Sequence, residues 1–545
     1  MPARGLALSV GLIVVAGVLT FSNSLAGPFI WDDLTSIQQN QTLRRVWPIS
    51  AALSPPRETP VGGRPLVNLS FAVNYAIGGL DVSGYHVGNI AIHIACALTL
   101  FGLVRRTLLG PRLRDRFGPS ANGVALVSAL LWMVHPLQTE PVDYLTQRTE
   151  SMMGLFWLLT LYCAMRARHS ARATRWLAAS VLACALGMAC KESMATAPLI
   201  VLLYDGIFEF DSFRQAIQAR WRLYAALAAT WVELAALISS LPRSTVGTSS
   251  GVGVWTYLLN QCEMIVQYLR LTLWPRALVL DYGLPHTRTI RDVLPQTVVV
   301  VSLLLATAVA LVRWKKVGFL CAAFFLTLAP TTSLIPIASE VGAERRMYLP
   351  LAALAVLAAL AGWSALDRLG ARSGKPSRRI ALVGATLAAG VVAVLATRTV
   401  YRNAEYASPL ALWRSVVERR PHGRARSALA SELIAAGSHD EAIGSFQRVA
   451  SLDPQSGSAQ RNLAQAYLQQ GNAHQAELHA REAVRLSPRD PAAHNLLADA
   501  LASQQQLDEA IDQFRQTLQI SPADARAREG LARALGLKHS PTRTP

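Results

Sequence analysis

Two adjacent carboxylates, Asp32 and Asp33, directly follow the first long apolar stretch of the chain, and their position makes them candidates for acid–base chemistry. That stretch runs from about Leu6 to Ala26, so the pair lies close to a membrane–water interface if the stretch spans a bilayer. A neighbouring acid and partial desolvation both raise a carboxyl pKa toward neutrality, where a carboxylate can accept a proton from a hydroxyl. We therefore predict a general base at this pair.

Other polar side chains collect at predicted membrane boundaries on the same side as the pair. Fixed cations that could bind an anionic phosphate group are Arg148, Lys191, Arg345 and Arg346. Side chains that could line a substrate cavity are Arg64, His86, Asn89, His93, His135, Glu140, Glu150 and Glu344. Each has an ordinary alternative, because cations also anchor helix ends, lone histidines also pack in cores and glutamates also pair with arginine. Their concentration on one side favours a functional interpretation.

Several classes of chemistry lack their signatures in this sequence. No phosphate-binding loop, dinucleotide fingerprint, HExxH pair or nucleophile elbow is present, which disfavours nucleotide-driven and hydrolytic reactions. The residues also show no recognisable metal-ligand spacing, so we predict no metal site and leave any requirement for a divalent metal open.

The elements that must position these groups are mostly membrane helices. Of the 545 residues, 52% are hydrophobic and only 16% are charged. The net charge of +18 could indicate nucleic acid, but the basic residues collect in short loops between apolar stretches, where they orient a membrane protein. No nucleic-acid recognition motif is present, so we predict membrane lipids as surroundings and no nucleic acid as partner.

Apolar stretches of spanning length predict about eleven crossings. The basic loops agree on one side only if Thr256–Trp274 does not cross, so we predict a re-entrant or interfacial helix there. This topology places the first outer loop, residues 27–86, and an outer region, residues 242–292, on the side of Asp32. Ser24-Leu25-Ala26 resembles a signal-peptidase site, so the first stretch is either an anchor or a cleaved signal.

Prolines recur in the polar tail at intervals of 33, 34 and 34 residues, at Pro421, Pro454, Pro488 and Pro522. A 34-residue period predicts tetratricopeptide (TPR) repeats. Small residues stand where paired helices must approach closely: Ala430, Ala442, Ala464, Ala476, Ala483, Ala498 and Ala510. The predicted fold class is all-α, with a membrane domain over 1–401, a linker and partial repeat over 402–422, and a TPR α-solenoid over 423–540.

The ordered motifs together resemble a known family. They include Gly27 through Asp33, Tyr85-His86-x-x-Asn89-x-x-x-His93, His135 through Glu140, Lys191-Glu192-Ser193 and Glu344 through Pro350, followed by the repeats. The chain resembles the GT-C glycosyltransferases, and among them the transmembrane-and-TPR O-mannosyltransferase-like proteins and their bacterial relatives. The resemblance implies that Asp32, with Asp33 beside it, is the catalytic base. Adjacent side chains on extended backbone point opposite ways, so only one is expected to face the acceptor.

The resemblance further implies transfer of a sugar, such as mannose, from a polyprenyl-phosphate donor to a hydroxyl of a protein or peptide. The TPR array would bind the acceptor or a partner protein on the periplasmic or luminal side of the membrane. The membrane itself would be a bacterial inner membrane. The alternative is a non-catalytic TPR membrane scaffold for assembly of envelope structures. A lipid or polysaccharide translocator is a further alternative, which the absence of polar groups through the bilayer centre disfavours.

Overall fold

The structure is a computed structural model that describes residues 2–240, 246–247, 251–333, 335–373 and 377–539. The chain forms two compact units, Met1–Ser408 and Pro409–Pro545. Both units are helical, and the described residues form no β-strand, only an isolated bridge between Val246 and Ile337. The predicted all-α class is confirmed. The parts of the 242–292 region at 242–245 and 248–250, and residue 540 of the repeat region, lie outside the described residues.

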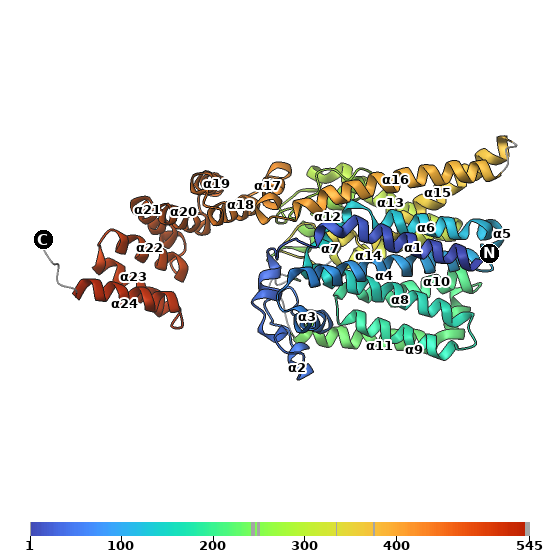
Figure 1. Ribbon diagram of the computed structural model, residues 1–545, viewed down its shortest axis with the longest axis horizontal. Coiled ribbons are helices and arrows are strands. Elements are labelled where there is room, and N and C mark those ends of the chain that lie inside the picture. The colour runs from blue at the N-terminus through green and yellow to red at the C-terminus, as the bar shows by residue number, and fades with distance from the viewer. Residues whose placement is uncertain (1, 241–245, 248–250, 334, 374–376, 540–545) are drawn as a thin grey trace. The chain divides into compact units, whose positions relative to one another are not determined.

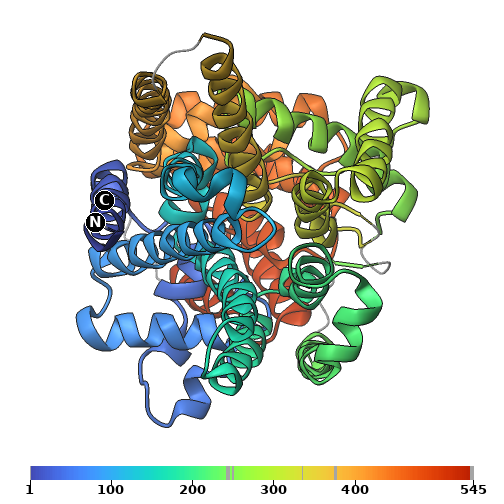
Figure 2. The same ribbon diagram turned by 90° about the vertical axis from the view of Figure 1, so that its right-hand side faces the viewer.

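The first unit is a bundle of long helices (Figure 1), joined by short turns or by longer connections such as residues 22–64, 274–293 and 333–349. Its principal helices are α1 (Pro2–Phe21), α3 (Pro65–Gly78), α4 (Val82–Leu109), α6 (Ala121–Met133), α8 (Arg148–Arg168), α9 (Ala173–Met188), α10 (Ala197–Tyr204), α11 (Phe213–Ser240), α12 (Val254–Leu273), α13 (Leu294–Arg313), α14 (Lys315–Thr332), α15 (Pro350–Ser373) and α16 (Ser377–Glu405). Three single turns are α2 (Ile49–Ala52), α5 (Arg114–Phe117) and α7 (Thr139–Asp143). Successive helices such as α8 and α9 pack against each other, and Figure 2 views many of them nearly end-on.

Six segments are long and apolar enough to cross a membrane: Arg4–Ser24, Val82–Leu109, Phe213–Ser239, Ile290–Arg313, Pro350–Gly370 and Arg379–Glu405. A bent pair, Arg114–Met133 with Pro136–Asp143, raises the number to seven if it is one span. These segments expose large apolar side chains, such as Leu8, Leu387 and Val312, whose natural solvent is lipid. An integral membrane protein is thus supported, and the further crossings among the predicted eleven stay a prediction.

The two ends of this bundle differ in the residues they hold. At one end, which we call the Asp32 end, α8 begins at Arg148 and the turns after α9 and α14 carry Lys191 and Arg345. At the other, the Arg166 end, α4 and α8 finish and the Nζ of Lys316 donates to the carbonyl of Arg112 at 2.8 Å. Because α8 has 21 residues, about 30 Å of helix separates the two ends.

The helix α12 covers the predicted re-entrant segment and is not among the membrane-span candidates. Its polar residues are buried in protein: Gln261 donates to the carbonyl of Val341 at 2.9 Å, and Asn260 donates to that of His286 at 2.7 Å. The first contact holds α12 against the loop that carries Arg345 and Arg346, and the second holds it against the connection to α13. Its placement relative to a bilayer stays a prediction.

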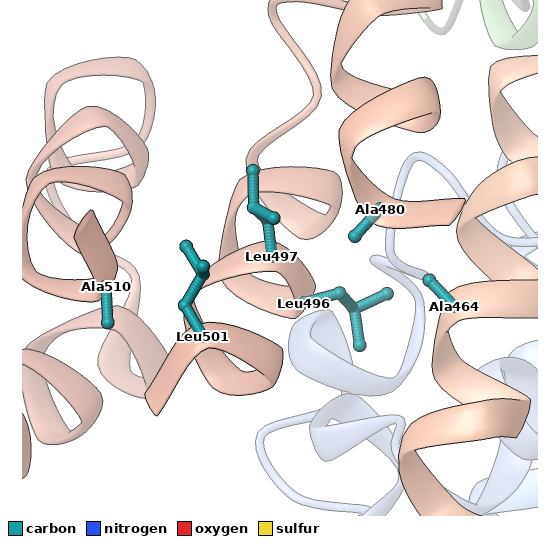
Figure 3. Close-up of a cluster of buried hydrophobic side chains, with 6 residues drawn as sticks. All are labelled: Ala464, Ala480, Leu496, Leu497, Leu501 and Ala510. Carbon is teal, nitrogen blue, oxygen red and sulfur yellow. The ribbon is translucent and has the colours of Figure 1, made fainter. Parts of the chain in front are cut away.

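The second unit is a solenoid of paired helices: α17 (Pro409–Arg419), α18 (Gly423–Ala435), α19 (His439–Leu452), α20 (Gly457–Gln470), α21 (Ala473–Leu486), α22 (Pro491–Ser503), α23 (Leu507–Ile520) and α24 (Ala525–His539). All seven predicted alanines are buried, and Figure 3 shows Ala464, Ala480 and Ala510 beside Leu496, Leu497 and Leu501. A Cβ on Gly530 would lie 2.4 Å from the ring of Phe514, so glycine permits the close approach of α24. The predicted TPR architecture is confirmed.

Candidate active site

The structure separates the two adjacent carboxylates into different environments. Asp33 is fully buried, and its Oδ1 accepts hydrogen bonds from the backbone N–H of Thr146 at 2.7 Å and from the hydroxyl of Thr146 at 2.5 Å. Its Oδ2 accepts from the N–H of Ile30 at 3.1 Å. Asp32 is half-buried, and Trp31 before it has a φ of +44°, a conformation that costs a non-glycine residue about 1–3 kcal/mol and is typical of functional sites.

Burial raises the pKa of Asp33 to about 7, the charge of Asp32 adds to the rise, and the hydrogen bonds from Thr146 and Ile30 oppose it. Oδ1 of Asp33 accepts the hydrogen bonds that join the first outer loop to the turn before α8, and Oδ2 accepts one from within that loop. Asp33 therefore serves as an anchor, whereas Asp32 keeps part of its surface exposed.

Tyr144 lies against Asp32. Its hydroxyl accepts from the backbone N–H of Asp32 at 3.1 Å and forms a hydrogen bond with the Asp32 side chain. Burial and the charges of Asp32 and Asp33 raise the pKa of Tyr144 well above 10, while the charge of Arg345 lowers it. Tyr144 therefore keeps its proton, orients Asp32 and lies within electrostatic range of Arg345.

Three cations gather at the Asp32 end, and we call Arg64, Lys191 and Arg345 the cation cluster. Burial lowers the pKa of Lys191, its partner Glu150 opposes this, and the charges of Arg64 and Arg345 lower it further. Arg64 and Arg345 thus each lie within electrostatic range of Lys191. The three side chains are 10–16% exposed, so each keeps a small accessible surface.

Every member of the cation cluster is held by a carboxylate. Lys191 pairs with Glu150, Arg64 donates to Glu192 at 3.1 Å, and Arg345 donates to Glu140 at 2.5 Å and also pairs with Glu340. The backbone N–H of Arg345 also donates to Glu140, at 2.8 Å. Such charge-assisted bonds fix the cations in position before any ligand binds.

The other two predicted phosphate-binding cations have different surroundings. Arg148 is 2% exposed and donates to the side chains of Asn89 at 2.6 Å and Asn74 at 2.5 Å and to the carbonyl of Tyr85 at 2.8 Å. Its guanidinium also lies 4.4 Å from the ring centre of Phe71. Arg148 therefore joins α3, α4 and α8, and these contacts do not favour the predicted phosphate role.

Arg346 is likewise enclosed, with 3% of its surface exposed. It donates to the carbonyl of Thr331 at 3.0 Å, to the hydroxyl of Tyr257 at 3.2 Å and to Glu340 at 3.0 Å. These bonds tie α12 and α14 to the loop before α15, so its phosphate role stays a prediction that the contacts do not favour.

The predicted cavity-lining imidazoles are buried and hydrogen-bonded. His86 Nε2 lies 3.0 Å from the carbonyl of Gly27, and the ring nitrogens of His93 lie 3.0 Å from the Tyr348 hydroxyl and the Met133 carbonyl. His135 Nδ1 accepts from the N–H of Leu137 at 3.2 Å, and Nε2 lies 3.1 Å from the carbonyl of Thr272. These contacts agree with packing roles. Within the described residues, no three His, Cys, Asp or Glu side chains gather as metal ligands.

Two glutamates of the loop before α15 have opposite electrostatics. Burial raises the pKa of Glu344 to about 8, although Arg402 lies 3.7 Å away. Glu344 accepts from the N–H of Val279 at 2.5 Å and has no exposed surface. Burial would also raise the pKa of Glu340, but the charges of Arg345 and Arg346 outweigh it and lower the value to about 2. Glu340 is therefore an ionised partner of Arg345 and Arg346.

Sequence reasoning did not select Tyr144, Thr146 or Glu340. Tyr144 and Thr146 lie in the predicted outer loop between His135 and Glu150, from which only charged residues and His135 were selected. Their hydroxyl groups, next to those residues in the sequence, were the signal that could have found them. Their contact with the acidic pair joins residues 112 and 113 positions apart, which local patterns do not report.

Comparison with family models and curated proteins gives two matches and a set of relatives. Residues 65–239 match the dolichyl-phosphate-mannose-protein mannosyltransferase model, and residues 398–457 and 461–525 match a tetratricopeptide repeat model. Protein O-mannosyl-transferase Tmtc1 of Drosophila melanogaster is 28% identical over 372 residues, 62% of this chain and 41% of that protein. Human protein O-mannosyl-transferase TMTC2 is 30% identical over 36% of this chain and 24% of its own length.

Protein O-mannosyl-transferase TMTC4 of Mus musculus is 26% identical over 74% of this chain and 61% of its own length, so the chain spans less than two thirds of each of these relatives. Among solved structures, the first TPR of Spaghetti (RPAP3) bound to an HSP90 peptide is 23% identical and covers 22% of this chain and 94% of that one, with a TM-score of 0.21. The structure of a MamA RS-1 double mutant is 20% identical, covers 26% of this chain and 81% of that one, and has a TM-score of 0.24.

Proposed function

The chain matches the transmembrane-and-TPR O-mannosyltransferase-like family in both of its parts, and on that premise we propose that it is a membrane glycosyltransferase. It moves a sugar, with mannose the first to test, from a polyprenyl-phosphate donor to a hydroxyl of a protein or peptide. Asp32 is the general base. The observation that carries this proposal is the separation of the acidic pair, with Asp33 used as an anchor and Asp32 half-buried beside Tyr144.

In the proposed reaction the acceptor hydroxyl attacks the anomeric carbon of the donor sugar. A bond forms between the acceptor oxygen and that carbon, the bond to the lipid phosphate breaks, and the hydroxyl proton passes to the carboxylate of Asp32. Such assistance is typically worth about 10²–10⁴-fold in rate. A single displacement of this kind inverts the anomeric centre.

The cation cluster stabilises the negative charge that remains on the polyprenyl phosphate. Arg64, Lys191 and Arg345 are ordered by their own carboxylates, so they need little reorganisation when the charge develops. Tyr144 lies within electrostatic range of both Asp32 and Arg345, which supports a single site for the base and the leaving group.

The membrane topology in this proposal has about eleven crossings, with the shorter helices crossing between the six long apolar spans. The end of α16 supports this arrangement, because Asn403 donates to the carbonyl of Thr20 near the end of α1 at 3.0 Å. The last membrane helix therefore finishes at the Asp32 end. We propose that the TPR unit follows on that side, the periplasmic side of a bacterial inner membrane.

The decisive experiment compares Asp32→Asn with Asp33→Asn in purified protein supplied with polyprenyl-phosphate mannose and candidate peptides. Asp32→Asn is expected to keep its fold and donor binding and to lose transfer by about 10²-fold or more. Asp33→Asn, the matched control, should lower the unfolding temperature. An amide has one acceptor oxygen, so it cannot replace the carboxylate in all three hydrogen bonds. Wild-type turnover by Asp32→Asn would contradict the assignment.

The role of the TPR unit is tested by removing residues 409–545, because the first compact unit ends at Ser408. Cutting earlier would remove Asn403 and Arg402, which bond to residues of the membrane unit. We propose that the array binds the acceptor or a partner protein, so the truncated protein should transfer sugar to short peptides and lose selectivity for longer acceptors. Loss of partner recruitment with no transfer in any assay of the full chain would favour the scaffold alternative.

A further inference from the structure

A second polar site lies at the Arg166 end of the bundle, away from the acidic pair. It is a cavity of about 460 Å³, a size typical of ligand sites, between the last turns of α4 and α8 and the turn that carries Glu209. Four guanidinium groups line it: Arg105, Arg106, Arg114 and Arg166. We call this the arginine cavity.

The arginines of this cavity differ from others at the same end because no carboxylate pairs with them within the described residues. Arg112 donates to Asp211 at 2.7 Å, and Arg220 donates to Asp205 at 2.6 Å. In contrast, Arg105 donates through Nε to Asn122 at 2.5 Å, and Arg106 donates through Nε to the hydroxyl of Tyr162 at 3.2 Å. Their charges are oriented by neutral groups and stay uncompensated.

The remaining charged group in the lining does not neutralise the four cations. Glu209 has a 7% exposed side chain, lies 3.1 Å from His169 Nε2 and lies 4.0 Å from Nε of Arg168. Glu209 therefore contacts His169 and Arg168, and a single carboxylate leaves the four lining arginines with a net positive charge. The positive-inside rule explains why basic residues lie on one side of a membrane, but it does not require four of them to converge on one cavity that holds a single acid, Glu209.

The chemistry of the cavity points to a phosphate group. Guanidinium groups bind phosphate oxygens through paired, charge-assisted hydrogen bonds. The lining also includes Leu109 and Met165, which give one wall an apolar character. Arg166 lies 4.5 Å from the ring centre of Trp176, and tryptophan is a residue type enriched at membrane interfaces.

We propose that the arginine cavity binds the phosphate of an anionic phospholipid headgroup from the leaflet opposite the Asp32 end. Basic pockets between the ends of membrane helices are suited to such headgroups. The apolar residues Leu109 and Met165 contact the first methylenes of the acyl chains, and the four arginines compensate the phosphate charge. The lipid then bridges α4 and α8, the same two helices that Arg148 joins at the Asp32 end.

The test uses the full chain in phosphatidylcholine nanodiscs doped with phosphatidylglycerol, with retained lipid measured by native mass spectrometry. Wild type is expected to retain phosphatidylglycerol about tenfold over its share in the disc. Arg106→Gln/Arg166→Gln should lose this enrichment, since each charge-assisted contact is worth about tenfold in affinity. The matched control, Arg172→Gln/Arg175→Gln, removes two exposed charges in the following turn and should keep it.

A second variant guards against misfolding. Arg114 is exposed at the cavity rim, so Arg114→Gln should fold normally and reduce the enrichment about threefold to tenfold. Equal losses in the cavity variants and the Arg172→Gln/Arg175→Gln control would overturn the proposal in favour of general surface charge. Displacement of phosphatidylglycerol by millimolar inorganic phosphate would overturn the lipid assignment in favour of a soluble phosphate ligand.

Discussion

The two ends of the membrane bundle use arginine and lysine in opposite ways. At the Asp32 end each member of the cation cluster has a carboxylate partner, so the site is ordered and nearly neutral before a ligand arrives. In the arginine cavity the guanidinium groups have neutral partners or none within the described residues. Paired cations suit a charge that appears briefly during a reaction, whereas unpaired ones suit an anion that stays bound.

The largest effect is expected from Lys191→Met at the Asp32 end. The variant leaves Glu150 buried without its cation, which typically costs about 3–5 kcal/mol of unfolding free energy, and it should abolish sugar transfer. Thermal unfolding in detergent and the transfer assay measure the two losses. The double variant Lys191→Met/Glu150→Leu should regain stability without regaining transfer. Recovery of transfer in the double variant would show that Lys191 is only structural.

At the Arg166 end the same comparison separates paired from unpaired arginines. Arg220→Gln leaves the buried Asp205 uncompensated and should lower the unfolding free energy by about 3 kcal/mol. Arg166→Gln removes an arginine that has no acidic partner among the described residues and should cost less than about 1 kcal/mol. Denaturant or thermal unfolding of both variants measures the difference. Similar losses would mean that Arg166 has a structural role of its own.

The pH dependence of stability should distinguish two glutamates of one loop. The folded pKa of Glu344, about 8, exceeds the ordinary value of 4.5, so its stabilising contribution is fully present below about pH 4.5 and is lost as the pH rises toward 8. The folded pKa of Glu340, about 2, lies below 4.5, so its contribution is present above about pH 4.5 and is lost as the pH falls toward 2.

The corresponding variants are Glu344→Gln and Glu340→Gln. Their unfolding temperatures are measured at pH values between 3 and 8. Relative to wild type, Glu344→Gln should gain a few degrees as the pH rises, and Glu340→Gln should lose a few degrees over the same range. Parallel curves for the two variants would contradict the opposite shifts.

The smallest effect is expected from Arg112→Gln, which removes an exposed ion pair with Asp211 at the Arg166 end. Exposed pairs contribute about 0–1 kcal/mol, so the unfolding temperature and the retained phosphatidylglycerol should both stay close to wild type. A marked loss of lipid in this variant would extend the binding surface beyond the arginine cavity.

Local patterns were sufficient for the architecture. Apolar stretches and a 34-residue period depend on side chains within a few helical turns, and the structure shows helices there and buried alanines at the seven predicted positions. The same patterns also indicated which loops carry the acidic pair, Lys191 and Arg345, because charged groups next to apolar stretches stand out in sequence.

The individual roles in the candidate site depended on contacts that span the chain. Asp33 is an anchor because Thr146 meets it across 113 positions, and Arg345 is held by Glu140 across 205 positions. Arg148 is enclosed by α3 and α4 and bonds to neutral groups, whereas Lys191 pairs with Glu150, so only the folded structure distinguishes the two cations. Burial and pairing decide a side chain's charge and reach, and both are properties of neighbours that one stretch of sequence does not contain.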